Sequence, residues 1–322
     1  MFAPFAKTLP HPLELIFRGG WTSVQTFFVL SGLVLARTYN TTPWNSRNLR
    51  KYFLARFARV YPGYLLSLIV VSPFIYTTLV TGSGKDWAPG HKAFLLFNYL
   101  FVLQGWTGDL HVGWNTPAWS LSCEFIFYLC FPLLALTVGI RTLRSNLVLL
   151  AAALLLPTLL ATLGVPDTWK PIHHLADFFT GIAAAAILDR LTLKSGSWLY
   201  IPAILSFLAI IAYPTVVERL CVLNTALRPV NALLLLGFAL GGGWLARILS
   251  TPVAGFLGQA SYAMYILHIP LLWWCKRYDL PGYFGLDNTP AAIIFMLCVV
   301  GIASLAFHFV EEPANKTLRG LL

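Results

Sequence analysis

Charged residues are scarce in this chain, and their scarcity decides its class. Asp, Glu, Lys and Arg together make up 11% of the 322 residues, whereas hydrophobic residues make up 58%. A soluble domain contains about 25% charged residues. The mean hydropathy of +0.73 points the same way. The composition therefore excludes an ordinary soluble domain and predicts an integral membrane protein.

Cysteine motifs and hydrolase motifs are absent from the sequence as well. The five cysteines lie in or beside apolar runs without C-x-x-C spacing, so we interpret them as small buried hydrophobic residues. The G-x-S-x-G elbow of serine hydrolases is also missing. That absence argues against a hydrolase site built from Ser120, Glu124 and His268.

Long apolar runs are abundant, and a membrane-spanning helix needs about 20 such residues. The sequence predicts nine spans, over residues 22–38, 60–80, 119–138, 146–164, 173–188, 198–217, 229–247, 256–275 and 290–310. A further run, 93–104, is shorter, so we expect a short or re-entrant helix there. No soluble linker interrupts the pattern. We therefore expect one all-α, polytopic domain over residues 1–322.

The positive charges predict an orientation and a kind of partner. The net charge is +10, and the densest basic cluster lies between residues 37 and 59, which places that segment in the cytoplasm. Scattered basic residues of this kind suit anionic lipid headgroups or an anionic substrate. A nucleic-acid partner is not expected, because no separate basic domain is present.

One acidic residue lies inside an apolar helix predicted from the stretch NTPAWSLSCEFIFYLCFP (115–132). Ser120, Glu124 and Tyr128 are four residues apart and share one helix face, and Trp119 lies on another face. An ionised side chain inside a bilayer helix costs about 3 kcal/mol on insertion scales. Glu124 must therefore face protein, water or a substrate. It either makes a structural hydrogen bond or ion pair, or it belongs to a functional site.

Arg56 and Arg59 are one turn apart in YFLARFARVYP (52–62), on one side of a helix that enters the membrane. Their side chains either extend toward the membrane surface or bind phosphate, because the guanidinium fork matches phosphate oxygens. We favour the phosphate interpretation.

Four other groups of polar residues are candidates. Ser261, Tyr265 and His268 form a polar stripe on an apolar helix. The pair Ser31–Gly32 permits close helix packing or lines a site. Asp109 and His111 lie in a Trp-rich loop that suits binding of sugars or lipid headgroups. His173, His174 and Asp177 have a spacing that suits either a metal site or the start of a helix.

These motifs together resemble the acyltransferase family 3 membrane proteins, which O-acylate sugars of bacterial surface polysaccharides, peptidoglycan, Nod factors and some small molecules. The matching stretches occur in the family's order, and they are FFVLSGLVLA (27–36), LARFARVYPGYLLSL (54–68), NTPAWSLSCEFIFYLCFPLL (115–134), DFFTGIAAA (177–185), LGQASYAMYILHIPLL (257–272) and FHFVEEPANK (307–316). Family members normally open with a further helix that carries an arginine and a histidine regarded as the catalytic base. This chain begins after that point, and His11 lies in a proline-rich stretch that does not match.

The resemblance implies transfer of an acyl group, expected to be acetyl, from acyl-CoA to a carbohydrate hydroxyl at the plasma membrane, without a metal. It implies that Arg56 and Arg59 hold the donor phosphates and that Glu124 and His268 act in catalysis. The implied substrate pocket contains Ser31, Trp119, Ser120, Tyr128 and Tyr265. The alternatives are a truncated, non-catalytic family member and a transporter of acyl or glycan units, although no second copy of WSLSCE indicates the repeats of many transporters.

Overall fold

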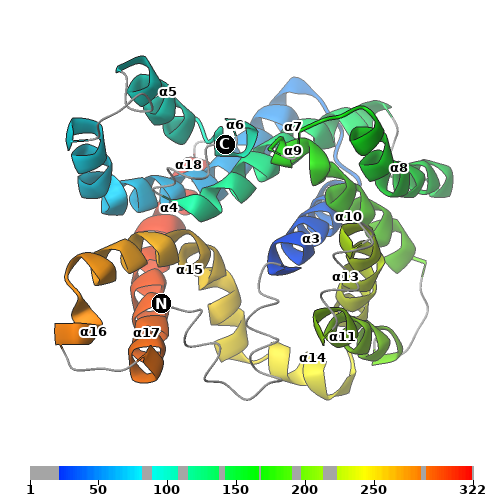
Figure 1. Cartoon of the computed structure of the whole chain (residues 1–322). Helices are drawn as coiled ribbons and strands as arrows, with labels where there is room; N and C mark the ends of the chain where they lie inside the picture. Colours follow the sequence, from blue (N-terminus) through cyan, green and yellow to red (C-terminus); the bar gives the residue numbers. More distant parts are fainter. Residues whose placement is uncertain are drawn as a thin grey trace. The chain divides into compact units, whose positions relative to one another are not determined.

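The computed structural model describes residues 22–81, 89–107, 115–137, 142–166, 168–190, 197–212, 223–283 and 288–320. Within these ranges every regular element is a helix, which confirms the all-α prediction (Figure 1). The longer helices are α3 Thr22–Tyr39, α4 Ser46–Thr81, α5 Pro89–Leu100, α7 Trp119–Thr137, α8 Leu143–Thr162, α10 Leu175–Leu188, α11 Ser197–Ala212, α13 Leu223–Leu240, α15 Pro252–Arg277, α17 Asn288–Ala306 and α18 Glu312–Gly320. The shorter ones are α6 Gln104–Thr107, η4 Thr116–Ala118, α9 Lys170–His173, α14 Gly243–Leu249, α16 Leu280–Tyr283 and the π-helical turn η5 Phe307–Glu311.

The helices have the length and surface of membrane spans. Among the described residues, five are long and apolar enough to cross a bilayer, or six if the bent pair α13–α14 is one span. Fewer helices thus meet these criteria than the nine predicted, although each predicted range overlaps a helix. Large apolar side chains cover the outer surfaces; Ile69, Leu155 and Leu297 are 60%, 67% and 66% exposed. Such surfaces belong in lipid, so the chain is an integral membrane protein.

Two predicted boundaries differ from the structure. The predicted span 60–80 starts too late, because α4 already begins at Ser46, where the side chain of Asn45 accepts a hydrogen bond from the backbone N–H of Asn48 at 2.9 Å. The predicted span 229–247 is broken, because α13 and α14 meet at an angle of 79°. Gly241, Gly242 and Gly243 all have positive φ angles there, a conformation that favours glycine. By contrast, most of the run at 93–104 lies on α5, whose 12 residues are too few to cross a bilayer, as expected.

The chain divides into two compact units, each assembled from separated stretches. With the gaps given above, the first unit contains residues 45–122 and 255–320, and the second contains residues 22–44 and 123–254. In the first unit, α18 and the turn η5 pack against α4. Helix α15 is joined to α4 by hydrogen bonds from Tyr262 Oη to the Val60 carbonyl oxygen, 2.7 Å, and from Trp274 Nε1 to the Val70 carbonyl oxygen, 2.8 Å.

Helix α10 is the centre of the second unit, where it packs against α3, α8 and α13 (Figure 1). It approaches α3 so closely that a Cβ atom on Gly181 would collide with the Val29 carbonyl oxygen, and one on Gly32 would collide with the Phe178 carbonyl oxygen. Small residues at such a crossing allow two backbones to touch. The packing interpretation of Gly32 is therefore confirmed.

Replacing the glycine at this crossing is expected to destabilise the protein. Gly181→Ala forces the two backbones apart, which costs about 1–3 kcal/mol of unfolding free energy, the usual range for overpacking. The matched control is Gly301→Ala in α17, where an added Cβ meets no atom within 4 Å. There the gain in helix propensity should leave stability unchanged or raise it by up to about 1 kcal/mol. Denaturant unfolding in detergent measures both, and equal effects at the two sites would contradict the crossing.

Candidate functional site

The polar face of α7 that carries Glu124 lies inside the protein. Ser120, Glu124 and Tyr128 are 2%, 6% and 4% exposed, whereas Leu129 and Leu133 of the same helix are more than half exposed. The Tyr128 hydroxyl donates a hydrogen bond to Glu124 Oε1. The structure thus places Glu124 away from lipid, with a neighbour from its own helix face, while the nearby Trp119 is half-buried.

Two of the predicted pocket residues meet in the first unit. Ser120 Oγ and Tyr265 Oη both donate hydrogen bonds to the carbonyl oxygen of Pro117, at 2.9 and 3.0 Å. These bonds hold the start of α7 against the middle of α15. Ser261 does not join this group, because it is exposed and donates to the Gly258 carbonyl oxygen of its own helix.

His268 has one ring nitrogen fixed by the backbone of α15. Its Nδ1 lies 2.6 Å from the carbonyl oxygen of Tyr265, and a carbonyl can only accept a hydrogen bond. This contact assigns the proton of the neutral ring to Nδ1 and leaves a lone pair on Nε2. The ring is partly exposed. A histidine held in this tautomer is able to take a proton from a bound hydroxyl group.

A buried polar network in the first unit escaped the sequence analysis. Asn115 Nδ2 donates to Ser67 Oγ at 2.9 Å and to the Ile266 carbonyl oxygen at 3.0 Å, which connects the α7 entry with α4 and α15. Gln104 Nε2 donates to the Tyr64 hydroxyl, 2.5 Å. The hydroxyl of Ser122 donates to the Val102 carbonyl oxygen at 2.6 Å. The available signal was that Asn115 and Gln104 are amides at the edges of apolar runs.

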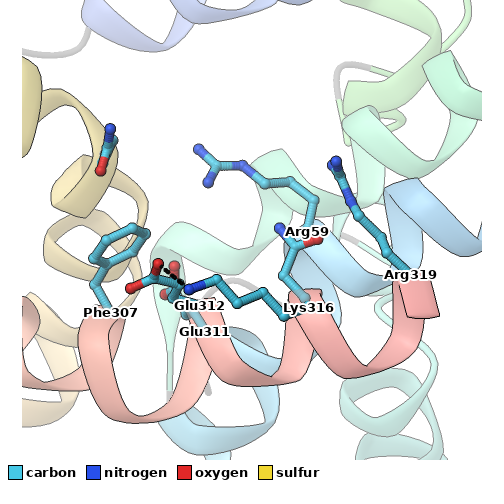
Figure 2. A pocket seen from close by; sticks show the side chains of 8 residues that line it. Arg59, Phe307, Glu311, Glu312, Lys316 and Arg319 are labelled. Atoms are coloured by element: carbon cyan, nitrogen blue, oxygen red, sulfur yellow. Dashed lines mark ion pairs between the residues drawn. The ribbon is translucent and has the colours of Figure 1, made fainter.

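Arg59 lines a pocket in the first unit, at the junction of α4, α15, η5 and α18 (Figure 2). The cavity has a volume of about 290 Å³ and is lined by Arg59, Gln259, Phe307, Glu311, Glu312, Asn315, Lys316 and Arg319. Three cations and two acids therefore surround one cavity. The described lining does not include Arg56, which is half-buried one turn earlier on α4.

The two adjacent acids of this pocket differ. Glu312 Oε1 forms an ion pair with Lys316 Nζ at 2.7 Å, the dashed contact in Figure 2. Its other oxygen, Oε2, lies 3.5 Å from His308 Nδ1. Glu311 is 4% exposed, and its two buried carboxylate oxygens have no hydrogen-bond partner among the described residues. From the sequence alone, both acids either pair with cytoplasmic arginines or only end the last predicted span, and the difference between them is not predicted.

The second unit contains a buried ion network around Asp177. Arg228 Nε lies 2.7 Å from Asp177 Oδ1, and His174 Nδ1 lies 2.7 Å from Oδ2. Asp177 is fully buried and Arg228 is 3% exposed. The carboxylate is therefore occupied by two side chains, and His173 turns away to the Pro166 carbonyl oxygen. Within the described ranges, no group of three or more His, Cys, Asp or Glu side chains is placed to hold a metal.

The remaining predicted residues are placed as follows. Ser31 is half-buried on α3 of the second unit, next to the Gly32 crossing. Glu124 belongs to the second unit and His268 to the first. Their common pocket stays a prediction, and Asp109, His111 and His11 lie outside the described residues.

Comparison with known proteins identifies the family of this chain. Residues 2–308 match the family model described as an acyltransferase domain. The chain belongs to this family. The acyltransferase resemblance drawn from its motifs is thereby confirmed, and the protein is an enzyme that transfers acyl groups other than amino-acyl groups.

Several relatives are similar to this acyltransferase over most of its length. The acyltransferase MdmB of Streptomyces mycarofaciens is 29% identical, over 93% of this chain and 82% of the relative. The peptidoglycan O-acetyltransferase OatA of Listeria monocytogenes is 25% identical, over 93% of this chain and 52% of the relative. A putative O-acetyltransferase of Staphylococcus aureus is 22% identical, over 92% and 53%. The chain thus spans about half the length of the latter two, and no solved structure matches it.

Removing one member of the Asp177 network is expected to be strongly destabilising. Asp177→Ala leaves the guanidinium of Arg228 buried without its anion, which costs about 3–5 kcal/mol. The control Asp189→Ala removes an exposed acid just after the same helix and should change stability by less than about 0.5 kcal/mol. Unfolding of the purified protein in detergent compares the two. If both variants were as stable as the parent, the network would have no structural role.

Proposed function

We propose that this acyltransferase moves an acyl group, in the simplest case acetyl, from acyl-CoA to a hydroxyl of a carbohydrate acceptor at the plasma membrane. The observation that carries the proposal is the basic pocket at Arg59, within a chain whose family transfers acyl groups. Acyl-CoA is a donor that carries several phosphates, and such a donor needs fixed cations. The identity of the donor as acyl-CoA and that of the acceptor as a carbohydrate both belong to this proposal.

The pocket suits the phosphate-bearing end of a donor. Arg59 of α4 lines the same cavity as Lys316 and Arg319 of α18 (Figure 2). A guanidinium binds phosphate oxygens through two parallel hydrogen bonds, so a pair of arginines provides both charge and orientation. Arg56, one turn earlier on the same helix, extends this basic surface along α4. We place the pocket on the cytoplasmic side, where the positive-inside rule puts the Arg59 segment and where acyl-CoA is made.

Two polar groups carry the proposed chemistry. His268 holds its proton on Nδ1 and offers Nε2 to the acceptor hydroxyl as a general base. Glu124 orients the acceptor or stabilises the charge that develops on the base, and the hydrogen bond from Tyr128 fixes its carboxylate. Ser31, Trp119, Ser120 and Tyr265 line the acceptor site in this proposal. A site within the membrane also excludes bulk water, which protects the thioester from hydrolysis.

The relatives support a carbohydrate of the cell envelope as the acceptor. The Listeria protein is named for O-acetylation of peptidoglycan, and the Staphylococcus relative is named as a putative O-acetyltransferase. Both share most of this chain. We therefore propose a lipid-linked or polymeric glycan as acceptor.

Loss of Arg59 is expected to weaken donor use. Arg59→Ala should raise the KM for acetyl-CoA by about tenfold or more, because a charge-assisted contact to phosphate is lost. The control Arg50→Ala removes an exposed arginine of the same helix and should leave KM unchanged. Transfer of radiolabelled acetyl groups by protein in detergent is the assay. Product formed without any ion gradient would also exclude transport as the whole function, whereas equal KM values for the two variants would remove Arg59 from the donor site.

The proposed base and its acidic partner have a separate test. His268→Ala and Glu124→Gln should each lower kcat by about 10²-fold or more at similar KM, the usual contribution of a positioned acid or base. His308→Ala provides the control, because that ring is 66% exposed near the end of α17. Membrane insertion and monodispersity must match the parent. Full activity in both site variants would contradict the assignment of His268 as the base and Glu124 as its partner.

A further inference from the structure

Glu311 is the buried group that the proposed mechanism does not use. It ends the π-helical turn η5, and a π-helical turn inserts one extra residue per turn, which redirects the following side chains. Such turns are frequent at functional sites. The redirected carboxylate enters the Arg59 pocket, where both of its oxygens are buried without a described hydrogen-bond partner. A buried carboxylate needs a hydrogen-bond donor, and none of the described residues provides one.

The structure makes room for Glu311 at a specific residue of α4. A Cβ atom on Gly63 would lie 2.5 Å from Glu311 Oε1 and 2.8 Å from Tyr262 Cε1. A side chain at this position would therefore have to displace the carboxylate of Glu311 or the ring of Tyr262. Tyr262 in turn is held by its hydrogen bond to the Val60 carbonyl oxygen. Glu311 of η5 thus lies buried beside Gly63 of α4 and Tyr262 of α15.

The cations of the pocket are not all available to a ligand. Lys316 is already paired with Glu312, 2.7 Å away. Arg59 and Arg319 have no ion pair within 4.0 Å among the described residues. The pocket therefore offers two guanidinium groups for an anion and, beside them, one buried carboxylate that requires a hydrogen-bond donor.

We propose that the Arg59 pocket binds a phosphate monoester that has a hydroxyl on the neighbouring carbon, and that Glu311 accepts a hydrogen bond from that hydroxyl. A bare phosphate fits poorly, because its charge and the carboxylate repel each other. A hydroxyl between them separates the two anions and satisfies Glu311. On the proposed donor the group with this pattern is the 3′-phosphorylated ribose, whose 2′-hydroxyl is adjacent to the phosphate. The diphosphate of the same donor has no hydroxyl beside it.

The size of the pocket agrees with this fragment. Sites for whole cofactors are typically about 300–1,000 Å³, and this cavity is at the lower end with about 290 Å³. It is therefore suited to one end of a donor, with the rest extending beyond it. The inference rests on the proposed function, because it names the part of acyl-CoA that this pocket recognises. It adds Glu311 and Arg319 as specificity-determining residues.

Three soluble fragments of the donor distinguish the contribution of the 3′-phosphate to binding from that of the 2′-hydroxyl. Calorimetry on the purified chain compares adenosine 3′,5′-bisphosphate, adenosine 5′-monophosphate without the 3′-phosphate, and 2′-deoxyadenosine 3′,5′-bisphosphate without the hydroxyl. The first should bind about tenfold or more tightly than each of the others, the ratio of one charge-assisted hydrogen bond or more. Acetyl-CoA should bind more tightly than 3′-dephospho-acetyl-CoA by a similar ratio of Kd values.

Variants assign each preference to its residue. Arg319→Gln should abolish the preference for the 3′-phosphate, and Glu311→Leu, which keeps the volume, should abolish only the preference for the 2′-hydroxyl. Glu311→Gln keeps an acceptor oxygen and should retain part of the latter. Arg277→Gln, at the exposed end of α15, should change neither. Each variant must unfold at the same midpoint as the parent protein. If Glu311→Leu misfolds, the binding ratios of the three fragments to Glu311→Gln decide the test.

The outcomes separate this inference from the function on which it rests. Tight binding of acetyl-CoA with equal affinity for its 3′-dephospho form would overturn the pocket assignment and leave the proposed donor in place. Failure to bind acetyl-CoA at all would overturn both. If phosphatidylglycerol in nanodiscs bound in an Arg319-dependent way while none of the adenosine fragments did, the same chemistry would belong to a lipid headgroup, and the ribose assignment would be wrong.

Discussion

A carboxylate in a lipid-embedded helix must be surrounded by protein or by a ligand, and this constraint governs the interior of the enzyme. In the part of the chain that the structure describes, three acids are buried, and they meet this constraint in different ways. Asp177 is neutralised by Arg228 and flanked by His174. Glu124 accepts a hydrogen bond from Tyr128 of its own helix. Neither carboxylate oxygen of Glu311 has a hydrogen-bond partner among the described residues. The three acids thus differ in how far the described residues satisfy them.

Part of this arrangement could be predicted from the sequence. The stripe Ser120, Glu124, Tyr128 follows from helical periodicity alone, because residues four apart share a face in any helix. The helical class follows from composition, and the enzyme class from the order of motifs along the chain. These predictions depend on local spacing or on the whole chain, which are the two properties that a sequence displays directly.

The rest depended on contacts between distant residues. Asp177 was considered as a metal ligand or a helix start, because its partner Arg228 is 51 positions away and carries no signal that pairs them. The burial of Glu311 depends on a π-helical turn and on the missing side chain of Gly63 in a helix about 250 positions earlier. The break in the predicted span 229–247 was missed for another reason. Its three glycines at 241–243 also fit an apolar run, and hydropathy does not register the φ angle.

The glycine contact between α3 and α10 also limits how the second unit can change shape. The two helices touch through main-chain atoms at Gly32 and Gly181, with no side chain between them whose rotamer could switch. Sliding one helix along the other would drive Cβ atoms of neighbouring residues into carbonyl groups. The pair therefore resists sliding, and a change of shape in this unit has to occur elsewhere; the glycines at the α13–α14 corner have the backbone freedom for it.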